Sequence, residues 1–285
     1  MGDIMMKDLK IIKTTLDIGL GHEYKFLHIT DTHIALDDDD LPPSNRYKCF
    51  DKDFENCSVE YYHMAAAYAK ENGLMMLNTG DFLDFLSKKN FEFADKYLMN
   101  TDTIYAAGNH DFCHRVGFAK EDYQYKWDHI KLSASHLPNN LYFYSRVIDG
   151  VNFVTLDNSY YLMTDGQIEL LRAEAARGYP IVLGVHNPFY NEDQANKVLG
   201  VGNKCAYLVG APEELLETYP ADRRAQQTPD APTLRAIEYI YSEPMIKAII
   251  AGHTHHNFEE KLPCGIPQIT TAGSYTGYVR EITLI

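Results

Sequence analysis

Five short apolar runs, each followed closely by Gly, Asp, Asn or His, constrain the fold of this chain more than any other feature. Runs of this length that stop at such residues are typical of strands buried on both faces of a sheet. In α/β proteins, ligands collect where such strands reach their carboxyl ends. Five strand ends that present these side chains together predict one site. The runs are 26–30, 74–78, 103–107, 181–185 and 246–251, and they lead to Asp31-Thr-His33, Gly80-Asp81, Gly108-Asn109-His110-Asp111, His186 and Gly252-His253-Thr-His255.

The residues between these runs predict helices and further strands. The dipeptide Asp149-Gly150 joins two apolar runs in the way a hairpin turn does. The segment 187–232 is expected to be a long irregular connection, and residues 9–18 an edge strand. We expect helices near 57–72, 87–99, 164–177 and 233–242, a hairpin of 141–148 with 151–157, and antiparallel strands at 267–272 and 278–285.

In these motifs the chain resembles the calcineurin-like metallophosphoesterases, whose pattern is DxH, GD, GNH followed by Asp or Glu, a lone His, and GHxH. All five blocks occur in this order, and the match runs from about residue 24 to about residue 274. The resemblance implies an α/β fold, the four-layer α/β/β/α sandwich of two mixed β-sheets flanked by helices. No linker or repeat divides the chain, so we expect one domain, 1–285, with an N-terminal edge extension, 1–23, and a specificity insertion, 187–232.

The resemblance also implies two adjacent metal ions, with Asp81 as the bridge between them. Two such cations, roughly 3.5–4 Å apart, can bind phosphoryl oxygens, acidify a bridging water and stabilise the attacking oxygen. Mixed imidazole and carboxylate sites favour Mn, Fe, Zn, Co or Ni over Mg or Ca, and the residues do not choose among them. By resemblance, the remaining ligands of one ion are Asp31, His33 and His255, and those of the other are Asn109, His186 and His253.

Two positions beside the bridge refine this expectation. Purple acid phosphatases place a tyrosine ligand three residues after the bridging Asp, and this chain has Asp84 there, so a tyrosinate-ligated ferric site is not expected. In the resembled family, the residue at His110 protonates the leaving oxygen or holds the phosphoryl group. Asp111 is expected to orient that imidazole and to favour its protonated form. The alternative for His110 is a structural histidine in a tight turn.

Substrate contacts are expected from loops rather than from strand ends. The first candidates are Asn45 and Arg46 in the loop after the first motif, and Arg115 after the third. The segment 187–232 adds Tyr190 and Tyr207, and long connections of this kind are usually functional or disordered. We interpret this segment as a specificity lid. Its two adjacent arginines, 223 and 224, are interpreted as surface residues paired with acidic neighbours.

Charge and composition limit the kinds of partner that this chain is expected to bind. The net charge is −14 and no run of Lys and Arg exists, whereas nucleic-acid binders show a basic footprint. No apolar run approaches the roughly 20 residues of a membrane span. The N-terminus lacks a basic region followed by an apolar core, so no secretory signal is predicted. The five cysteines show no CxxC spacing. We therefore expect reduced thiols in a cytoplasmic protein, with no membrane partner and a small phosphorylated substrate.

Three functions remain as hypotheses. The first is a metal-dependent hydrolase of a small phosphomonoester or phosphodiester, acting through a hydroxide activated by two metals. The second is a nuclease, against which the acidic balance counts. The third is a non-catalytic scaffold such as the family member in the retromer complex, and retention of His110 with every metal ligand argues against it. The oligomeric state is not predicted.

Overall fold

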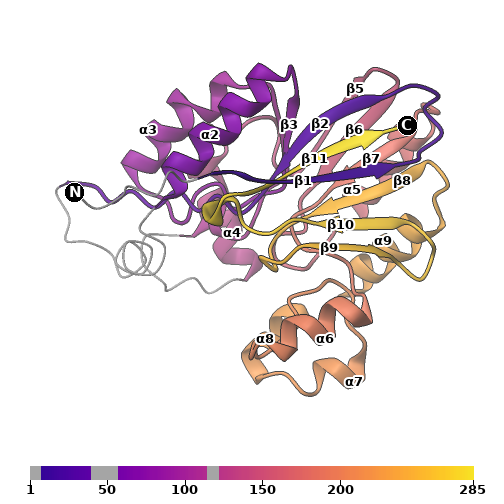
Figure 1. Ribbon diagram of the computed structural model, residues 1–285. Coiled ribbons are helices and arrows are strands. Elements are labelled where there is room, and N and C mark those ends of the chain that lie inside the picture. The colour runs from indigo at the N-terminus through magenta and orange to yellow at the C-terminus, as the bar shows by residue number, and fades with distance from the viewer. Residues whose placement is uncertain (1–7, 40–56, 114–121) are drawn as a thin grey trace.

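A computed structural model describes residues 8–39, 57–113 and 122–285. Two β-sheets pack face to face, and helices cover their outer faces (Figure 1). This arrangement confirms the expected α/β class with two mixed sheets flanked by helices. In spatial order, the first sheet contains β1 (Lys10–Leu16), β11 (Tyr278–Leu284), β2 (Tyr24–Ile29), β3 (Met75–Asn78) and β4 (Thr103–Tyr105), and the second contains β5 (Phe143–Ile148), β6 (Val151–Leu156), β7 (Ile181–Gly184), β8 (Ile246–Ala251), β10 (Pro267–Thr270) and β9 (Phe258–Lys261).

The strands that lead to the polar motifs run parallel to one another within each sheet. In the first sheet, β2, β3 and β4 are parallel, while β11 runs antiparallel to β2. In the second sheet, β7 and β8 are parallel, and the hairpin of β5 and β6 lies at one edge. Its turn residues, Asp149 and Gly150, both have positive φ, 49° and 82°, as a type I′ turn requires. Parallel neighbours bring their carboxyl ends to the same edge of a sheet.

The C-terminal runs 267–272 and 278–285 form β10 and β11, and each has the antiparallel neighbour that was expected. β10 pairs antiparallel with β9, and β11 pairs antiparallel with β2. The two strands lie in different sheets, and each also has a parallel neighbour, β8 for β10 and the edge strand β1 for β11. The short strand β9, Phe-Glu-Glu-Lys, was missed because two adjacent glutamates hide its alternation.

Three layers of apolar side chains separate the four layers of secondary structure. Phe26 and Leu27 are adjacent on β2, yet Phe26 packs between the sheets and Leu27 packs beneath the outer helices. Val182 and Leu183 divide in the same way on β7. These strands are therefore buried on both faces, as their apolar runs indicate. The helices of the two outer layers and the site edge are α2 (Ser58–Glu71), α3 (Lys88–Lys96), α4 (Tyr123–Ser133), α5 (Asp165–Ala175) and α9 (Ala231–Ser242), with 3₁₀ turns η1 (Leu98–Asn100), η2 (His110–Phe112) and η3 (Ser274–Thr276).

The expected irregular segment 187–232 is instead a helical unit that projects from the sandwich (Figure 1). It contains α6 (Glu192–Gly200), α7 (Glu213–Leu216) and α8 (Ala221–Gln227). Asn191, Pro212 and Pro220 occupy the N-cap positions of these three helices, and the Asn191 side chain accepts hydrogen bonds from the N–H groups of Asp193 and Gln194. Seven buried residues form its own apolar cluster: Ala195, Cys205, Ala206, Leu208, Ala211, Leu216 and Tyr219. Within the described ranges, no helix is both long enough and apolar enough to cross a bilayer.

Candidate metal centre

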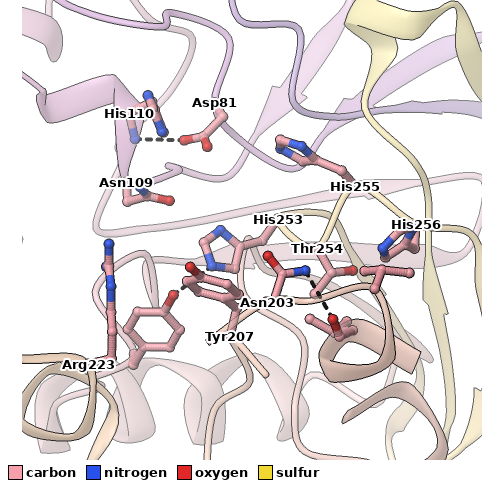
Figure 2. A pocket seen from close by; sticks show the side chains of 13 residues that line it. Asp81, Asn109, His110, Asn203, Tyr207, Arg223, His253, Thr254, His255 and His256 are labelled. Carbon is pink, nitrogen blue, oxygen red and sulfur yellow. Dashed lines mark hydrogen bonds between the residues drawn. The ribbon is translucent and has the colours of Figure 1, made fainter. Parts of the chain in front are cut away.

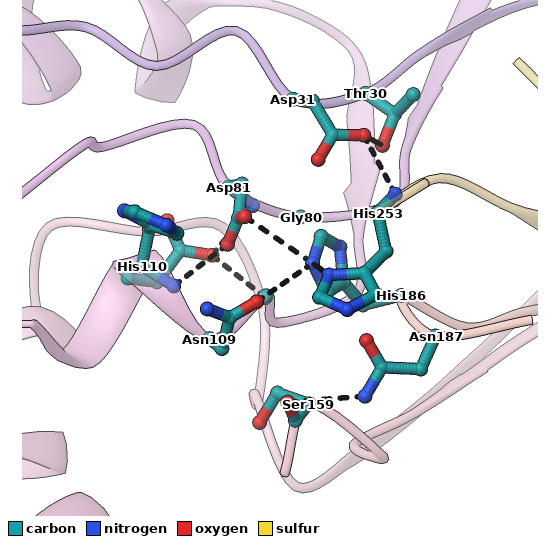
Figure 3. Close-up of polar contacts among 12 residues, drawn as sticks. Thr30, Asp31, Gly80, Asp81, Asn109, His110, Ser159, His186, Asn187 and His253 are labelled. Carbon is teal, nitrogen blue, oxygen red and sulfur yellow. Dashed lines mark hydrogen bonds and ion pairs between the residues drawn. The ribbon is translucent and has the colours of Figure 1, made fainter. Parts of the chain in front are cut away.

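The carboxyl ends of five strands from both sheets bring the predicted ligands to one place (Figure 3). Asp31 follows β2, Asp81 follows β3, Asn109 follows β4, His186 follows β7 and His253 follows β8. Their burial is nearly complete for the two aspartates and His186, at 0–1% exposed. Buried carboxylates require a compensating positive charge, so this edge of the molecule favours a bound cation.

The first group of candidate ligands is Asp31, His33 and His255. The Nε2 atoms of His255 and His33 lie 3.2 and 3.8 Å from Asp31 Oδ1. The Oδ2 atom of Asp31 accepts hydrogen bonds from the Thr30 hydroxyl at 2.7 Å and the His253 amide at 2.8 Å. Its Oδ1 atom is buried and accepts no hydrogen bond from the described residues. A buried carboxylate oxygen that lacks a hydrogen-bond donor and faces two imidazoles fits a metal ligand.

The second group is Asp81, Asn109, His186 and His253. His186 Nε2 lies 3.3 Å from Asp81 Oδ2, 3.2 Å from Asn109 Oδ1 and 3.0 Å from His253 Nδ1. Asp81 Oδ2 is also 3.8 Å from His33 Nε2, so this carboxylate lies between the two groups. Its other oxygen accepts the His110 backbone N–H at 2.7 Å, which fixes the carboxylate (Figure 3). The structure thus places Asp81 where a bridging ligand would have to lie.

The electrostatics of the second group also suit a cation. Burial alone would lower the pKa of His186, but the carboxylate of Asp81 raises it to about 9. Burial lowers the pKa of the neighbouring His253 well below its usual value, and the positive charge on His186 lowers it further. The carboxylates therefore favour one positive charge at this point, and a metal ion held by these residues would supply that charge while leaving the imidazoles neutral.

Two of the candidate histidines are held at the ring nitrogen that faces away from the centre. His33 Nδ1 lies 2.9 Å from the Asp84 carboxylate, and His186 Nδ1 donates to the Thr79 carbonyl at 2.7 Å. Such outer hydrogen bonds fix the orientation and tautomer of metal-ligating imidazoles. Asp84 therefore supports a candidate ligand.

The other two candidate histidines, His253 and His255, contact tyrosine hydroxyls, and these tyrosines lie outside the sequence motifs. The Tyr161 hydroxyl lies 2.6 Å from His253 Nε2, and the Tyr275 hydroxyl lies 3.1 Å from His255 Nδ1. Tyr161 follows β6 and Tyr275 follows β10, so both also come shortly after strand ends at this edge. Their position after strand ends was the one sequence signal for this role. Tyrosine occurs too often after strands for that position to single these two residues out.

These tyrosines provide a paired test of the two ligand groups. Tyr161→Phe should weaken metal binding at the group containing His253, and Tyr275→Phe at the group containing His255, by about 10–100-fold each. Each change removes one hydroxyl and keeps the ring. Titration of the metal-free protein with Mn²⁺ or Zn²⁺ by calorimetry resolves the two sites. Identical binding curves for both variants and the unaltered protein would contradict these supporting roles.

Backbone strain is concentrated at the same residues. A left-handed conformation costs a non-glycine residue on the order of 1–3 kcal/mol, and such strain clusters at functional sites. Gly80 (φ +103°) adds a steric requirement, because a Cβ there would lie 2.8 Å from His186 Nδ1. The strained candidate ligands, with φ between 48° and 66°, are Asp31, His33, Asp81, His253 and His255.

His110 faces the cavity in front of these groups. Its side chain is 22% exposed, and its ring meets the His33 ring edge-on at 4.7 Å between centroids. His110 Nδ1 lies 2.9 Å from the Asp84 carbonyl and 3.3 Å from the Asp84 carboxylate. Because a carbonyl only accepts, Nδ1 must donate, which fixes the tautomer. Asp84 therefore orients His110 as well as His33.

The expectation that Asp111 orients His110 is corrected by the structure. The carboxylate of Asp111 accepts hydrogen bonds from the backbone N–H groups of Gly108, Asp81 and Leu83 at 2.8–3.1 Å, and from the Tyr105 hydroxyl at 2.6 Å. His110 and Asp111 are successive residues of the 3₁₀ turn η2, where neighbouring side chains point about 120° apart. Asp111 therefore turns inward and ties the second motif to the third.

A cavity of about 410 Å³ lies between the candidate ligands and the helical unit (Figure 2). Tyr190 and Tyr207 both pack against the apolar cluster of the helical unit, and of the two only Tyr207 lines the cavity. Arg223 also lines it, although its side chain is 35% exposed and lies near its acidic neighbour Asp222, as expected of a surface residue, and Arg224 is exposed on α8. Asn45, Arg46 and Arg115 lie outside the described residues.

Comparison with known proteins adds a family and several similar folds. The family model for calcineurin-like phosphoesterases matches residues 24–257. No curated protein sequence matches the chain. A putative 5′-nucleotidase from Staphylococcus aureus is 15% identical with a TM-score of 0.47; the match covers 89% of this chain and 49% of that protein, so this chain spans about half its length. A dimetal phosphatase from Danio rerio is 14% identical over 89% of this chain and 88% of its own, with a TM-score of 0.44.

Proposed function

Because this chain belongs to the calcineurin-like phosphoesterases, we propose that it hydrolyses the phosphate ester of a small molecule with two adjacent transition-metal ions. The observation that carries the proposal is the shared position of Asp81 between two groups of candidate ligands, with His110 facing the cavity beside them. Phosphoester hydrolysis is the activity of the family. The number of metals, the size of the substrate and the residue roles are our proposal.

The donor sets suit Mn, Fe, Zn, Co or Ni, because they mix imidazole nitrogen with carboxylate and amide oxygen. Bound there, two such ions would polarise the phosphoryl oxygens and lower the pKa of a water nucleophile. The protein's contribution is a fixed cage. Nearly full burial of Asp31 and Asp81 excludes water from the carboxylates, and the outer hydrogen bonds hold the imidazoles in one orientation.

His110 is the proposed proton donor to the leaving oxygen. Its Nδ1 is committed to Asp84, so Nε2 is the nitrogen that can reach a substrate in the cavity. The Asp84 carboxylate, 3.3 Å from Nδ1, stabilises the protonated ring, which is the form that can donate. An alkoxide is a poor leaving group, so protonation of the leaving oxygen by His110 would speed cleavage of the phosphorus–oxygen bond.

Two other functions fit the molecule less well. A nuclease needs cations along a groove to hold the phosphate backbone. Arg223 is the one Lys or Arg among the described residues that line the cavity, and the whole chain carries a net charge of −14. A scaffold without catalysis would not need His110 held in one tautomer against Asp84, nor ligand residues kept in strained conformations.

The test compares three substrates after reconstitution with each candidate metal: p-nitrophenyl phosphate, bis-p-nitrophenyl phosphate and a single-stranded oligonucleotide. We expect turnover of at least one nitrophenyl ester, loss of that turnover with a chelator, and its return on addition of metal. Oligonucleotide cleavage faster than either nitrophenyl ester would favour the nuclease. Stable metal binding without turnover of any of the three would favour the scaffold.

A further inference from the structure

Arg223 brings a permanent positive charge to the cavity from the wall opposite the strand ends. It belongs to α8 of the helical unit. In Figure 2 its side chain extends into the cavity toward the side where Asn109 and His110 lie. The candidate ligands enclose any metal from one side, so a phosphoryl group bound to those ions would present its outward oxygens to the wall that carries Arg223.

Tyr207 positions the Arg223 guanidinium. The guanidinium carbon lies 5.8 Å from the centroid of the Tyr207 ring, within the range of a cation–π contact. The same ring meets the ring of His253 edge-on at 5.7 Å, so Tyr207 lies between Arg223 and a candidate ligand. Arg223 Nη1 also donates to Gln226 at 3.0 Å. Its acidic neighbour Asp222, 3.9 Å from Nε, is 78% exposed, so solvent screens that pair.

The position of Tyr207 is fixed in turn by the segment that follows His186. Val209 forms a parallel bridge with Phe189, three residues after His186, and its N–H donates to the Pro188 carbonyl at 2.8 Å. Tyr207 itself has a left-handed φ of 56°, which turns its ring back toward the site. The arginine and its ring support are therefore built on the same framework as the candidate ligands.

We propose that Arg223 binds the terminal phosphoryl group of the substrate and that this chain prefers phosphomonoesters to phosphodiesters. The inference rests on the proposed function and specifies its substrate class. A guanidinium presents two parallel N–H groups that match a pair of phosphate oxygens. A monoester has three non-bridging oxygens that share two negative charges. In a diester a second organic group replaces one of those oxygens, and only one charge remains.

The rest of the cavity suits a modest leaving group. Val198 and Val201 form an apolar part of its wall, and Asn203 adds one amide. A volume of about 410 Å³ is near the lower end of ordinary ligand pockets. One phosphoryl group and one small organic alcohol fit this description, whereas a second ester substituent would have to occupy the place of the oxygen that faces Arg223.

The test compares Arg223→Ala with Arg224→Ala on two esters that share one leaving group, p-nitrophenyl phosphate and bis-p-nitrophenyl phosphate. Arg224 is the matched control, because it is the next residue on α8, carries the same charge and is exposed. We expect Arg223→Ala to lower kcat/KM for the monoester by about 10–100-fold, the worth of a charge-assisted hydrogen bond, and for the diester much less. Arg224→Ala should leave the ratio of kcat/KM for the monoester to kcat/KM for the diester unchanged.

An equal effect of Arg223→Ala on both esters, or none on either, would overturn the inference while the proposed function stood. If the unaltered protein hydrolyses neither ester, the proposed function fails, and calorimetric binding of inorganic phosphate to the metal-reconstituted protein decides the role of Arg223. Equal phosphate affinity in Arg223→Ala would then overturn it. Arg223→Lys keeps the positive charge but lacks the planar pair of N–H groups. Its preference for the monoester should therefore fall between that of the unaltered protein and that of Arg223→Ala. This variant provides a test even if the alanine variant does not fold.

Discussion

Replacing His110 with alanine should lower turnover by about 10²–10⁴-fold, the usual contribution of a positioned acid–base group. The metal content should stay close to that of the unaltered protein, because the His110 ring is held by Asp84 and faces the cavity. Elemental analysis and steady-state kinetics on the same preparation check both halves. His22→Ala is the control, since His22 is a half-exposed histidine paired with Asp149 on the surface.

The leaving group separates the two roles that His110 can play. A nitrophenolate leaves readily without a proton, so the loss should be smaller for p-nitrophenyl phosphate than for an alkyl phosphate. A proton donor therefore predicts unequal losses. Equal losses for both esters would instead assign His110 to holding the phosphoryl group, and normal turnover in the alanine variant would exclude either role.

Asp81→Asn should weaken both metal sites together. Asp81 Oδ2 lies 3.3 Å from His186 and 3.8 Å from His33, one histidine in each group. An amide keeps the shape of the side chain but lacks the negative charge and offers only one oxygen. We expect the affinity of each site to fall by more than about 100-fold, the upper end of what loss of an outer hydrogen-bond partner costs.

His186→Asn is the matched comparison for that experiment. His186 belongs to the second group alone, so its replacement should lower the affinity of one site and leave the group of Asp31, His33 and His255 able to bind. Calorimetric titration and elemental analysis measure both. One ion bound at full affinity in Asp81→Asn would contradict the bridging position, and a stoichiometry of one in the unaltered protein would contradict two sites.

The sequence predicted the strands of the centre well, because their signal is local. A buried parallel strand must be apolar on both faces, so the runs before Asp31, Asp81 and His186 stand out by composition alone. The same ends carry the polar residues, and resemblance to a family supplied the proposed role of each. The helical unit was missed because its core uses small residues such as Ala195 and Ala206, which leave no clear apolar period.

The supporting contacts could not be predicted, because they join residues far apart in the chain. Tyr161 meets His253 across 92 positions, and nothing near either residue signals the pairing. The role expected of Asp111 was wrong for a related reason. Adjacency to His110 suggested contact, but in a 3₁₀ turn adjacent side chains diverge, and Asp84, 26 positions away, takes the place instead.

The helical unit is attached to the sandwich at its entry, at its exit and through α6, where the buried side chain of Gln194 donates to the hydroxyls of Thr254 and Thr270. At its entry, Gln268 of β10 exchanges hydrogen bonds with the backbone of Phe189, and at its exit Asp230 caps α9, which packs on the second sheet. Between these points the unit has its own apolar core. Substitutions inside it, away from Gln194 and Tyr207, which contact Thr254 and His253, can therefore accumulate over evolution without disturbing the ligand strands, so new substrate preferences could arise in descendants of this chain while the hydrolytic chemistry is inherited unchanged.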